Sequence, residues 1–206
     1  MKRLSVIFTI CALVSGSPLL AQDVAAAPKV IQPQPAMIAA MRAFASCVVH
    51  NDPKGAFAFL KNGQFATPNN PHVRSLVAAN RRCLSSGTLS FNQVWFAGAA
   101  AEAIYRNDGF RFADYPISNS AIGALRDLRS NAVLQGTCVA WSQPREVDAL
   151  FATEAGSAGE ARAITALGGS VQTCMKEKAQ FPVAIRSVVA AGSFPAVAPA
   201  IKALAQ

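Results

Sequence analysis

Apolar residues recur at intervals of three and four along most of the chain beyond residue 35, which is the spacing of one face of an α-helix. The first run predicts a helix over residues 36–51. One face of that helix carries the apolar side chains of Met37, Met41, Phe44, Ala45 and Val48. Runs of the same spacing predict further helices over 53–60, 71–83 and 91–105, so the pattern indicates an all-α fold.

Four helix starts are marked by a capping side chain that precedes a proline, or that stands three residues before Glu or Gln. The four signals are Asp52 with Pro53, Asn70 with Pro71, Ser90 with Gln93, and Ser157 with Glu160. Near the end of the chain, an apolar run that starts at Pro182 passes Ala191 and meets Gly192, Pro195 and Pro199. These residues predict a break after Ala191 and then a short terminal helix.

The helical pattern is used twice. Cys47 and Cys83 are 36 positions apart, as are Cys138 and Cys174, and a shift of 91 positions aligns the two pairs without a gap. The same shift aligns proline and apolar positions, among them Pro53 with Pro144, Val73 with Ile164, and Leu76 with Leu167. Self-similarity of this length indicates one supersecondary unit used twice, although two copies are too few for a stacked solenoid.

The first 21 residues have the pattern of a secretory signal peptide. Basic residues Lys2 and Arg3 precede an apolar run over 4–14, and small residues follow up to Ala21. The run is shorter than the about 20 apolar residues that cross a bilayer. We expect cleavage near Ala21, or alternatively near 25–27, and no transmembrane segment after cleavage. Residues 22–35 should then form a flexible lead-in. The expected location is periplasmic or secreted.

Signal removal takes Cys11 with it and leaves four cysteines in an oxidising compartment. An even number there indicates a disulfide framework, for which three connectivities exist. Because each copy of the repeat should keep its own bond, we favour Cys47 with Cys83 and Cys138 with Cys174. Each bond would contribute roughly 3 to 4 kcal/mol in the chain-entropy model. The alternative is that some of the four cysteines are buried free thiols. A zinc site is not expected, because the sequence has no Cys-x-x-Cys pair. No cofactor or other metal is expected either.

The repeat divides the mature chain into two half-domains, 36–106 and 121–206, with a connecting loop over 107–120. We expect a pseudo-symmetric helical bundle in which each half is stapled by one disulfide. The connecting loop has no counterpart after the second copy, and fourteen residues is long for a connection between helices. It is therefore the candidate recognition loop, unless its aromatic residues simply cover the junction of the two halves.

Positive charge and aromatic side chains define the candidate binding residues. Without Lys2 and Arg3, 17 basic residues face 11 acidic ones, a net charge of +6 that favours anionic partners. The basic residues are scattered, however, and solubility alone also explains such a distribution. The candidate binding residues are Arg81, Arg82, Phe110, Arg111, Phe112 and Tyr115. The expected partner is an unknown protein or an anionic component of the cell envelope, with no specific nucleic acid.

Two residues are candidates for catalysis. Glu102 stands in a run of small apolar residues, where burial would raise its pKa and suit it to acid or base chemistry. The simpler expectation is that Glu102 is solvated, or pairs with an arginine. The arginines considered are Arg42, Arg81, Arg82 and Arg106. His50 lies near the end of the first helix, where an exposed histidine is ordinary, and no paired carboxylates or glycine-rich phosphate loop accompany either residue.

Several of these positions together resemble a family. The pattern consists of Phe44-x-x-Cys47-Val48, Pro53, Cys83, Phe91 and the run Ala101-Glu102-Ala103-Ile104-Tyr105-Arg106. It is similar to exported proteins of unknown function from Gram-negative bacteria that carry a duplicated two-cysteine helical repeat. The resemblance covers most of the mature chain and implies no activity or site.

The sequence therefore favours a non-enzymatic exported protein that binds a partner at the junction of its halves, through the connecting loop and Arg81 with Arg82. The alternative is a cell-envelope hydrolase that uses Glu102 or His50. A redox protein with reactive Cys47 or Cys83 is a third possibility, disfavoured because no close cysteine pair is present.

Overall fold

A computed structural model describes residues 35–65, 70–84, 92–115, 131–175 and 182–201. All of them belong to one compact unit, Gln32–Gln206. The expected signal peptide and lead-in up to residue 34 lie outside the described residues. The described residues form α-helices and short 3₁₀ helices with no strand among them, which confirms the all-α prediction.

The elements follow one another in the same order in the two copies of the repeat. The first half contains α1 (Pro35–Asn51), α2 (Pro53–Lys61), α3 (Pro71–Ala79), η1 (Arg81–Cys83) and α4 (Gln93–Asp108), followed by the connecting turn η2 (Phe112–Asp114). The second half contains α6 (Asn131–Ser142), α7 (Pro144–Ala152), α8 (Ala158–Ala166), α9 (Gly168–Cys174) and α10 (Pro182–Val197), followed by η4 (Ala198–Ala200). This order is compatible with a duplicated unit.

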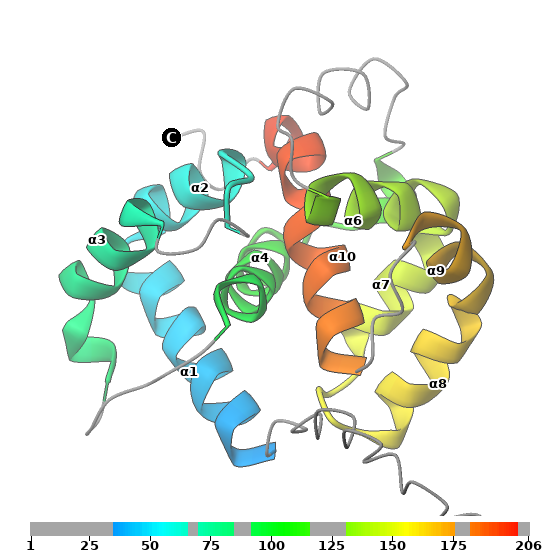
Figure 1. Ribbon diagram of the computed structural model, residues 1–206, viewed down its shortest axis with the longest axis horizontal. Helices are drawn as coiled ribbons and strands as arrows, with labels where there is room; N and C mark the ends of the chain where they lie inside the picture. Colours follow the sequence, from blue (N-terminus) through cyan, green and yellow to red (C-terminus); the bar gives the residue numbers. More distant parts are fainter. Residues whose placement is uncertain (1–34, 66–69, 85–91, 116–130, 176–181, 202–206) are drawn as a thin grey trace, which may run out of the picture. The chain divides into compact units, whose positions relative to one another are not determined.

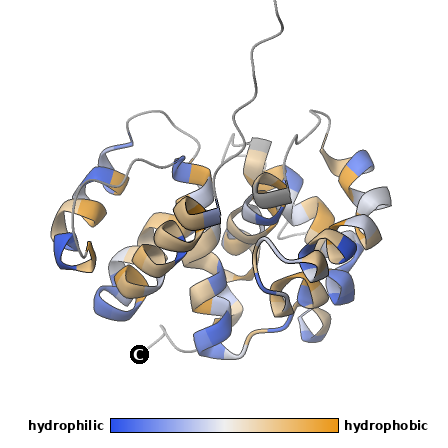
Figure 2. Ribbon diagram, turned by 90° about the horizontal axis from the view of Figure 1, so that it is seen from below, coloured by the Kyte–Doolittle hydropathy of each residue, from blue (hydrophilic) through white to orange (hydrophobic). Residues whose placement is uncertain are grey.

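The last long helix of each half, α4 or α10, forms the centre of the bundle. These two helices pack against each other, and each also packs against the first helix of its own half, α1 or α6 (Figure 1). Figure 2 shows mostly hydrophobic residues on the inner helices and hydrophilic residues toward the outer helices and helix ends. The contact between the halves is therefore a contact between two apolar helices.

Both expected disulfides are present. Cys47 of α1 is bonded to Cys83 of η1, and Cys138 of α6 is bonded to Cys174 of α9. Each bond ties the first helix of a half to the segment that precedes its central helix. The predicted pairing is confirmed, and the four cysteines are not free thiols.

Most helix starts agree with the capping signals. The side chain of Asp52 accepts a hydrogen bond from the Gly55 backbone N–H at 2.9 Å, and that of Asn70 accepts one from the His72 N–H at 2.9 Å. Helix α4 starts later than the Ser90 signal predicted. Its N-cap is Asn92, which accepts from the Val94 N–H at 2.8 Å, and Ser90 lies outside the described residues.

Several helix ends differ from the sequence prediction. Helix α3 stops at Ala79, so Cys83 lies in a 3₁₀ turn, and in the second half Leu167 separates α8 from α9. Helix α10 continues past Gly192 and includes Pro195, although a break was predicted. Proline in the last turn removes only one internal hydrogen bond, and packing against α4 and α6 stabilises the helix in spite of that loss. Met37 is also exposed, unlike the four other apolar residues of its predicted face.

Small residues permit the close approach of α4 to α10 and of α10 to α6. A Cβ atom on Gly98 of α4 would collide with the backbone of Ser187 on α10, and one on Gly192 would collide with the Ala132 carbonyl on α6. In both cases the obstacle is backbone, which cannot rotate away. The spacing of α4 from α10, between the halves, therefore depends on Gly98, and the spacing of α10 from α6, within the second half, depends on Gly192.

Replacing Gly192 tests this dependence. We expect Gly192→Ala to lower the free energy of unfolding by about 1 to 3 kcal/mol, the usual cost of overpacking a core. The matched control is Gly169→Ala, which also adds one methyl group to a helix but has open space around it. That change should be neutral or stabilising by up to about 1 kcal/mol. Urea unfolding of both variants provides the measurement, and equal effects would contradict the close contact of α6 with α10.

Candidate functional site

A buried ion pair joins the two halves. Glu102 on α4 and Arg186 on α10 have side chains that are only 2% and 1% exposed. Arg186 binds the carboxylate with two hydrogen bonds, from Nε to Oε1 at 2.8 Å and from Nη2 to Oε2 at 2.7 Å. Such a two-point contact between a guanidinium and a carboxylate is both strong and orientation-specific.

The local sequence explains why these two side chains meet. Glu102 is the only charged residue between Asn92 and Tyr105, and Arg186 is the only one between Pro182 and Ile201. Both helices are apolar around these residues, so each of the two charges would be buried without its main counter-charge if the other were absent. A buried charge is tolerated only with an opposite charge and further hydrogen bonds, and the packing of α4 on α10 supplies that partner.

Three further residues complete what we call the junction cluster, which consists of Arg42, Glu102, Arg106, Glu160 and Arg186. Arg42 of α1 donates to Glu102 from Nη2 at 3.0 Å and from Nη1 at 3.3 Å. Arg106, one turn further along α4, donates from Nη2 at 3.1 Å. Glu160 of α8 accepts from Arg186 Nη1 at 3.2 Å. The cluster thus connects α1, α4, α8 and α10.

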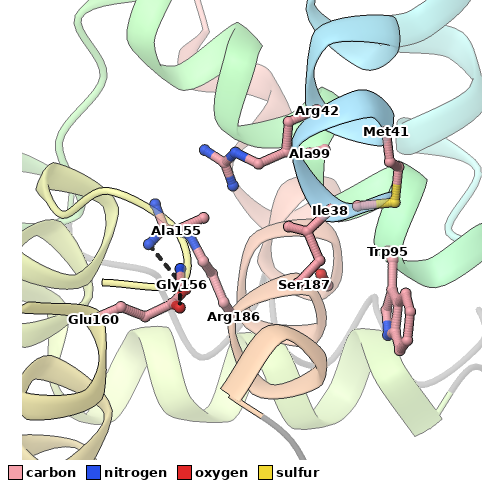
Figure 3. A pocket seen from close by; sticks show the side chains of 10 residues that line it. All are labelled: Ile38, Met41, Arg42, Trp95, Ala99, Ala155, Gly156, Glu160, Arg186 and Ser187. Atoms are coloured by element: carbon pink, nitrogen blue, oxygen red, sulfur yellow. Dashed lines mark hydrogen bonds and ion pairs between the residues drawn. The ribbon is translucent and has the colours of Figure 1, made fainter. Parts of the chain in front are cut away.

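The carboxylate of Glu160 accepts hydrogen bonds from two different groups, one on each oxygen. In Figure 3, dashed lines run from Glu160 to Arg186 and to the backbone of Gly156. The second bond, from the Gly156 N–H to Oε2, is 2.7 Å long, and Ser157 caps α8 by accepting from the Glu160 N–H at 3.1 Å. A cavity of about 10 Å³ lies beside these groups, too small for any ligand larger than water. This part of the cluster is therefore structural.

The arginines keep Glu102 ionised. Burial on its own raises the pKa of the Glu102 carboxyl, but the hydrogen bonds and charges of Arg186 and Arg42 outweigh burial and leave that pKa below its ordinary value. Burial lowers the pKa of Arg186, yet Glu102 and Glu160 more than compensate and raise it overall. A carboxylate that is fully hydrogen-bonded and easily ionised is poorly suited to act as a general acid or base. The geometry argues against a catalytic role for Glu102.

In the part of the chain that the structure describes, the two histidines have no catalytic partners either. His50 is exposed at the end of α1 and forms no ion pair with a carboxylate among the described residues. His72 borders a groove between α2 and α3 together with Asp52 and Ser75, but no hydrogen bond links these three side chains in the described structure. A nucleophile activated by a histidine would need such bonds.

A large cleft opens at the outer end of the cluster, between the C-terminal end of α4 and α7. We call it the α4–α7 cleft; its volume is about 550 Å³. Three arginines line it, and the side chains of Arg106 and Arg111 are 56% and 65% exposed. The third, Arg145, is exposed and has no ion-pair partner in the part of the chain that the structure describes. The cleft therefore presents several accessible positive charges.

The acidic residues at the cleft are already engaged. Glu102 is bound by the cluster, and Asp148 of α7 accepts the backbone N–H groups of Phe112 at 2.8 Å and Ala113 at 3.0 Å, one on each oxygen. Arg111 approaches Asp148 and Asp114 only at 4.0 and 3.9 Å. These contacts fix the connecting turn η2 against α7. Arg106 and Arg111 are paired with carboxylates, whereas Arg145 has no ion pair in the part of the chain that the structure describes.

Aromatic rings form the floor of the cleft. The Tyr105 ring lies 5.5 Å from that of Phe110 and 5.9 Å from that of Phe151, measured between centroids. The Tyr105 hydroxyl donates to the Ala190 carbonyl at 2.8 Å, and burial raises its pKa. Because the hydroxyl is anchored in α10, the ring beneath the cleft is fixed in position.

The structure separates the predicted binding residues into three groups. Phe110 and Arg111 line the α4–α7 cleft, and Tyr115 packs beside Phe110 at 6.0 Å between ring centroids. Phe112 is 1% exposed and belongs to the core, so part of the expected recognition loop covers the junction of the halves. Arg81 and Arg82 are exposed on η1 and do not line this cleft. The rest of that loop, 116–120, lies outside the described residues.

Sequence reasoning found Glu102 and two of its partners, Arg42 and Arg106, but missed four residues of the site. The missed residues are Arg145, Asp148, Glu160 and Arg186. A signal existed for Arg186, because a lone arginine in an apolar helix is the counterpart of a lone glutamate in another. Arg145 and Asp148 had none, since both look like ordinary surface positions of an amphipathic helix.

Comparisons with known proteins give no relative: no family model, no curated protein and no solved structure matches this chain. Among the described residues, none of the helices combines the length and hydrophobicity needed to cross a membrane. Within the same residues, no group of three or more His, Cys, Asp or Glu side chains is placed to hold a metal ion.

The junction cluster predicts how stability depends on Glu102. Replacing it with glutamine should cost about 3 to 5 kcal/mol at neutral pH, because Arg186 then loses its main buried counter-charge. The matched control is Glu154→Gln, at an exposed glutamate without an ion-pair partner in the described structure, which should change stability by less than about 0.5 kcal/mol. Chemical unfolding at pH 7 measures both.

The same residue predicts a pH dependence. The pKa of Glu102 is lower in the folded protein than its ordinary value of 4.5, so the unfolded chain binds the proton more readily. Its contribution to stability is therefore complete above pH 4.5 and is lost as the pH falls through the folded-state pKa. The difference in unfolding free energy between the natural chain and Glu102→Gln should shrink as the pH falls below about 4.5. A difference that stays constant down to pH 2 would contradict an ionised Glu102.

Proposed function

We propose that this chain is a non-enzymatic exported binding protein whose α4–α7 cleft takes an anion that carries an aromatic or apolar body. The observation that carries the proposal is the combination of exposed arginines with a fixed aromatic floor at a cleft of about 550 Å³. Ligand sites typically have this size and combine an apolar lining with a few polar groups.

The charge balance at the cleft supports an anionic ligand. Both acidic residues of the lining have their oxygens bound by Arg186 or by backbone N–H groups, whereas Arg145 has no carboxylate partner in the described structure. Guanidinium groups bind carboxylate, phosphate and sulfonate groups through paired hydrogen bonds. An anion entering the cleft therefore meets positive charge that the protein itself does not neutralise.

The aromatic lining supports the second half of the ligand description. Tyr105, Phe110 and Phe151 border the cleft, and their rings are held by contacts with one another and with the core. Tyr105 is buried, so the aromatic surface that a ligand can cover belongs to the partly exposed Phe110 and Phe151. Covering that surface with an apolar group is favourable, and pairs of rings gain further from stacked or edge-on contact. A ligand with charge alone would leave this surface in contact with water.

Two features support an exported protein. The bonded cysteine pairs are typical of an oxidising compartment, and the N-terminal residues have the pattern of a signal peptide. Both are consistent with the periplasm or the extracellular medium, where an anionic envelope component or a protein surface could supply the ligand group. The hydrolase alternative is less well supported, because Glu102 is ion-paired and His50 lacks a carboxylate partner in the described structure.

Titration with naphthalenesulfonate, monitored by NMR or calorimetry, tests the ligand class. The probe should bind, and Arg145→Ala should weaken its affinity about tenfold, equivalent to the loss of about 1.4 kcal/mol from a charge-assisted hydrogen bond. The matched control is Arg162→Ala, at an exposed arginine of α8 that does not line the cleft. Uncharged naphthol should bind more weakly than the sulfonate.

Further variants separate the possible binding surfaces. If Arg81→Ala combined with Arg82→Ala weakens binding and Arg145→Ala does not, the ligand sits on the first half and the cleft assignment is wrong. If naphthol binds as well as the sulfonate, the arginines have no role in recognition. Either outcome would overturn the proposed ligand class while leaving the fold unaffected.

Export is tested by expressing all 206 residues, including the expected signal peptide, in a Gram-negative host. The protein recovered from the periplasm or the medium should begin after Ala21, or near 25–27, and should show no free thiol by intact mass and thiol labelling. Recovery of the unprocessed chain from the cytoplasm would contradict export.

A further inference from the structure

A second cleft lies on the other side of Arg106, between α1 and α4. We call it the α1–α4 cleft; its volume is about 380 Å³. Its polar lining consists of Arg42 and Ser46 from α1 with Arg106 and Asn107 from α4. The other described lining residues are alanines. Among the described residues, this cleft therefore has neither the aromatic floor of the α4–α7 cleft nor a carboxylate in its lining.

The junction cluster holds more positive than negative charge. It contains three arginines and two glutamates, and Arg186 alone already occupies both oxygens of Glu102 with its shortest hydrogen bonds. Arg186 is also bound by Glu160 and is 1% exposed. The surplus positive charge is therefore shared by Arg42 and Arg106, whose longer bonds to Glu102 measure 3.0 to 3.3 Å.

These two arginines are also the accessible ones. The side chain of Arg42 is 21% exposed and that of Arg106 is 56% exposed, and both border the α1–α4 cleft. Burial, with Arg42 and Arg186 acting in the same direction, lowers the pKa of Arg106 in spite of the opposing effect of Glu102. Arg106 is therefore the more accessible of the two positive charges at this cleft.

The donors around the cleft suit an anion with several acceptor oxygens. Each guanidinium carries five N–H groups, of which Arg42 uses two and Arg106 one on Glu102. Ser46 adds a hydroxyl and Asn107 an amide, and neither makes a side-chain hydrogen bond within the described structure. Because the donors come from two helices, they can reach an anion from two sides.

We propose that the α1–α4 cleft binds a tetrahedral oxyanion of the phosphate or sulfate class, held by Arg42 and Arg106 with hydrogen bonds from Ser46 and Asn107. A flat carboxylate offers two oxygens in one plane, whereas a tetrahedral oxyanion can use all four donor groups. This site goes beyond the proposed function, since its ligand needs no aromatic part and its lining excludes Arg111 and Arg145. Arg106 borders both clefts.

Titration of the folded protein with inorganic phosphate, followed by amide and arginine side-chain NMR, tests the site. Phosphate should shift resonances of the residues that line the cleft, and Ser46→Ala combined with Asn107→Ala should weaken binding about tenfold. These exposed positions lie outside the junction cluster, so the variant should fold like the natural chain. Arg42→Gln should weaken binding more strongly, with circular dichroism to verify its fold.

The control variant is Arg145→Ala, which should leave phosphate affinity unchanged while it weakens naphthalenesulfonate binding. Loss of phosphate binding in Arg145→Ala, or phosphate binding that Ser46→Ala with Asn107→Ala and Arg42→Gln leave unchanged, would overturn the site. The two proposals can therefore fail separately.

Vesicles distinguish the two sources of the oxyanion. If the site takes a free anion, inorganic phosphate binds and vesicles of phosphatidylglycerol do not. If it takes a lipid headgroup, the protein sediments with phosphatidylglycerol vesicles, but not with phosphatidylcholine vesicles, and Ser46→Ala with Asn107→Ala reduces sedimentation. Absence of binding to both inorganic phosphate and phosphatidylglycerol would overturn the proposal.

Discussion

The ion pair of Glu102 with Arg186 constrains the rest of the structure. Each residue is the one charge in the apolar stretch of a central helix, 92–105 in α4 and 182–201 in and after α10, and each is almost fully buried where α4 meets α10. If the two helices packed in another way, each charge would be buried without its counter-charge. An unpaired buried charge destabilises the folded state by several kcal/mol. The pair therefore specifies which faces of the two halves meet, and Gly98 allows α4 to come close enough to α10.

The same pair sets the charge available for binding. Arg186 satisfies Glu102 and is itself satisfied by Glu160, so Arg42 and Arg106 contribute positive charge beyond what the core needs. Arg106 lies between the two clefts, with aromatic rings on one side and small and polar residues on the other. The buried ion pair thus holds the two halves together and also leaves the positive charges of Arg42 and Arg106 accessible at their junction. The two clefts differ in lining and so in the anions that each would accept.

The sequence predicted the elements whose signals are local. Capping residues with proline placed the starts of α2 and α3, and the repeat gave the disulfide pairing, because both depend on short-range spacing. It failed where tertiary packing overrides local preference: α10 continues through Pro195, and Phe112 turns into the core. The sequence predicted part of the site, namely Glu102 with Arg42 and Arg106, but not Arg186. A lone glutamate in an apolar run indicates a buried partner, but which arginine supplies it depends on how two distant helices pack.

The central claim is that Arg186 compensates Glu102 and leaves Arg106 available for a ligand. Two double-mutant cycles measure this directly, one combining Glu102→Gln with Arg186→Gln and the other combining Glu102→Gln with Arg106→Gln. Unfolding free energies should give a coupling of about 3 kcal/mol or more for the buried pair and less than about 1 kcal/mol for the exposed one. A coupling to Arg106 as large as that to Arg186 would show that Arg106 is needed to neutralise the core, and would contradict the account.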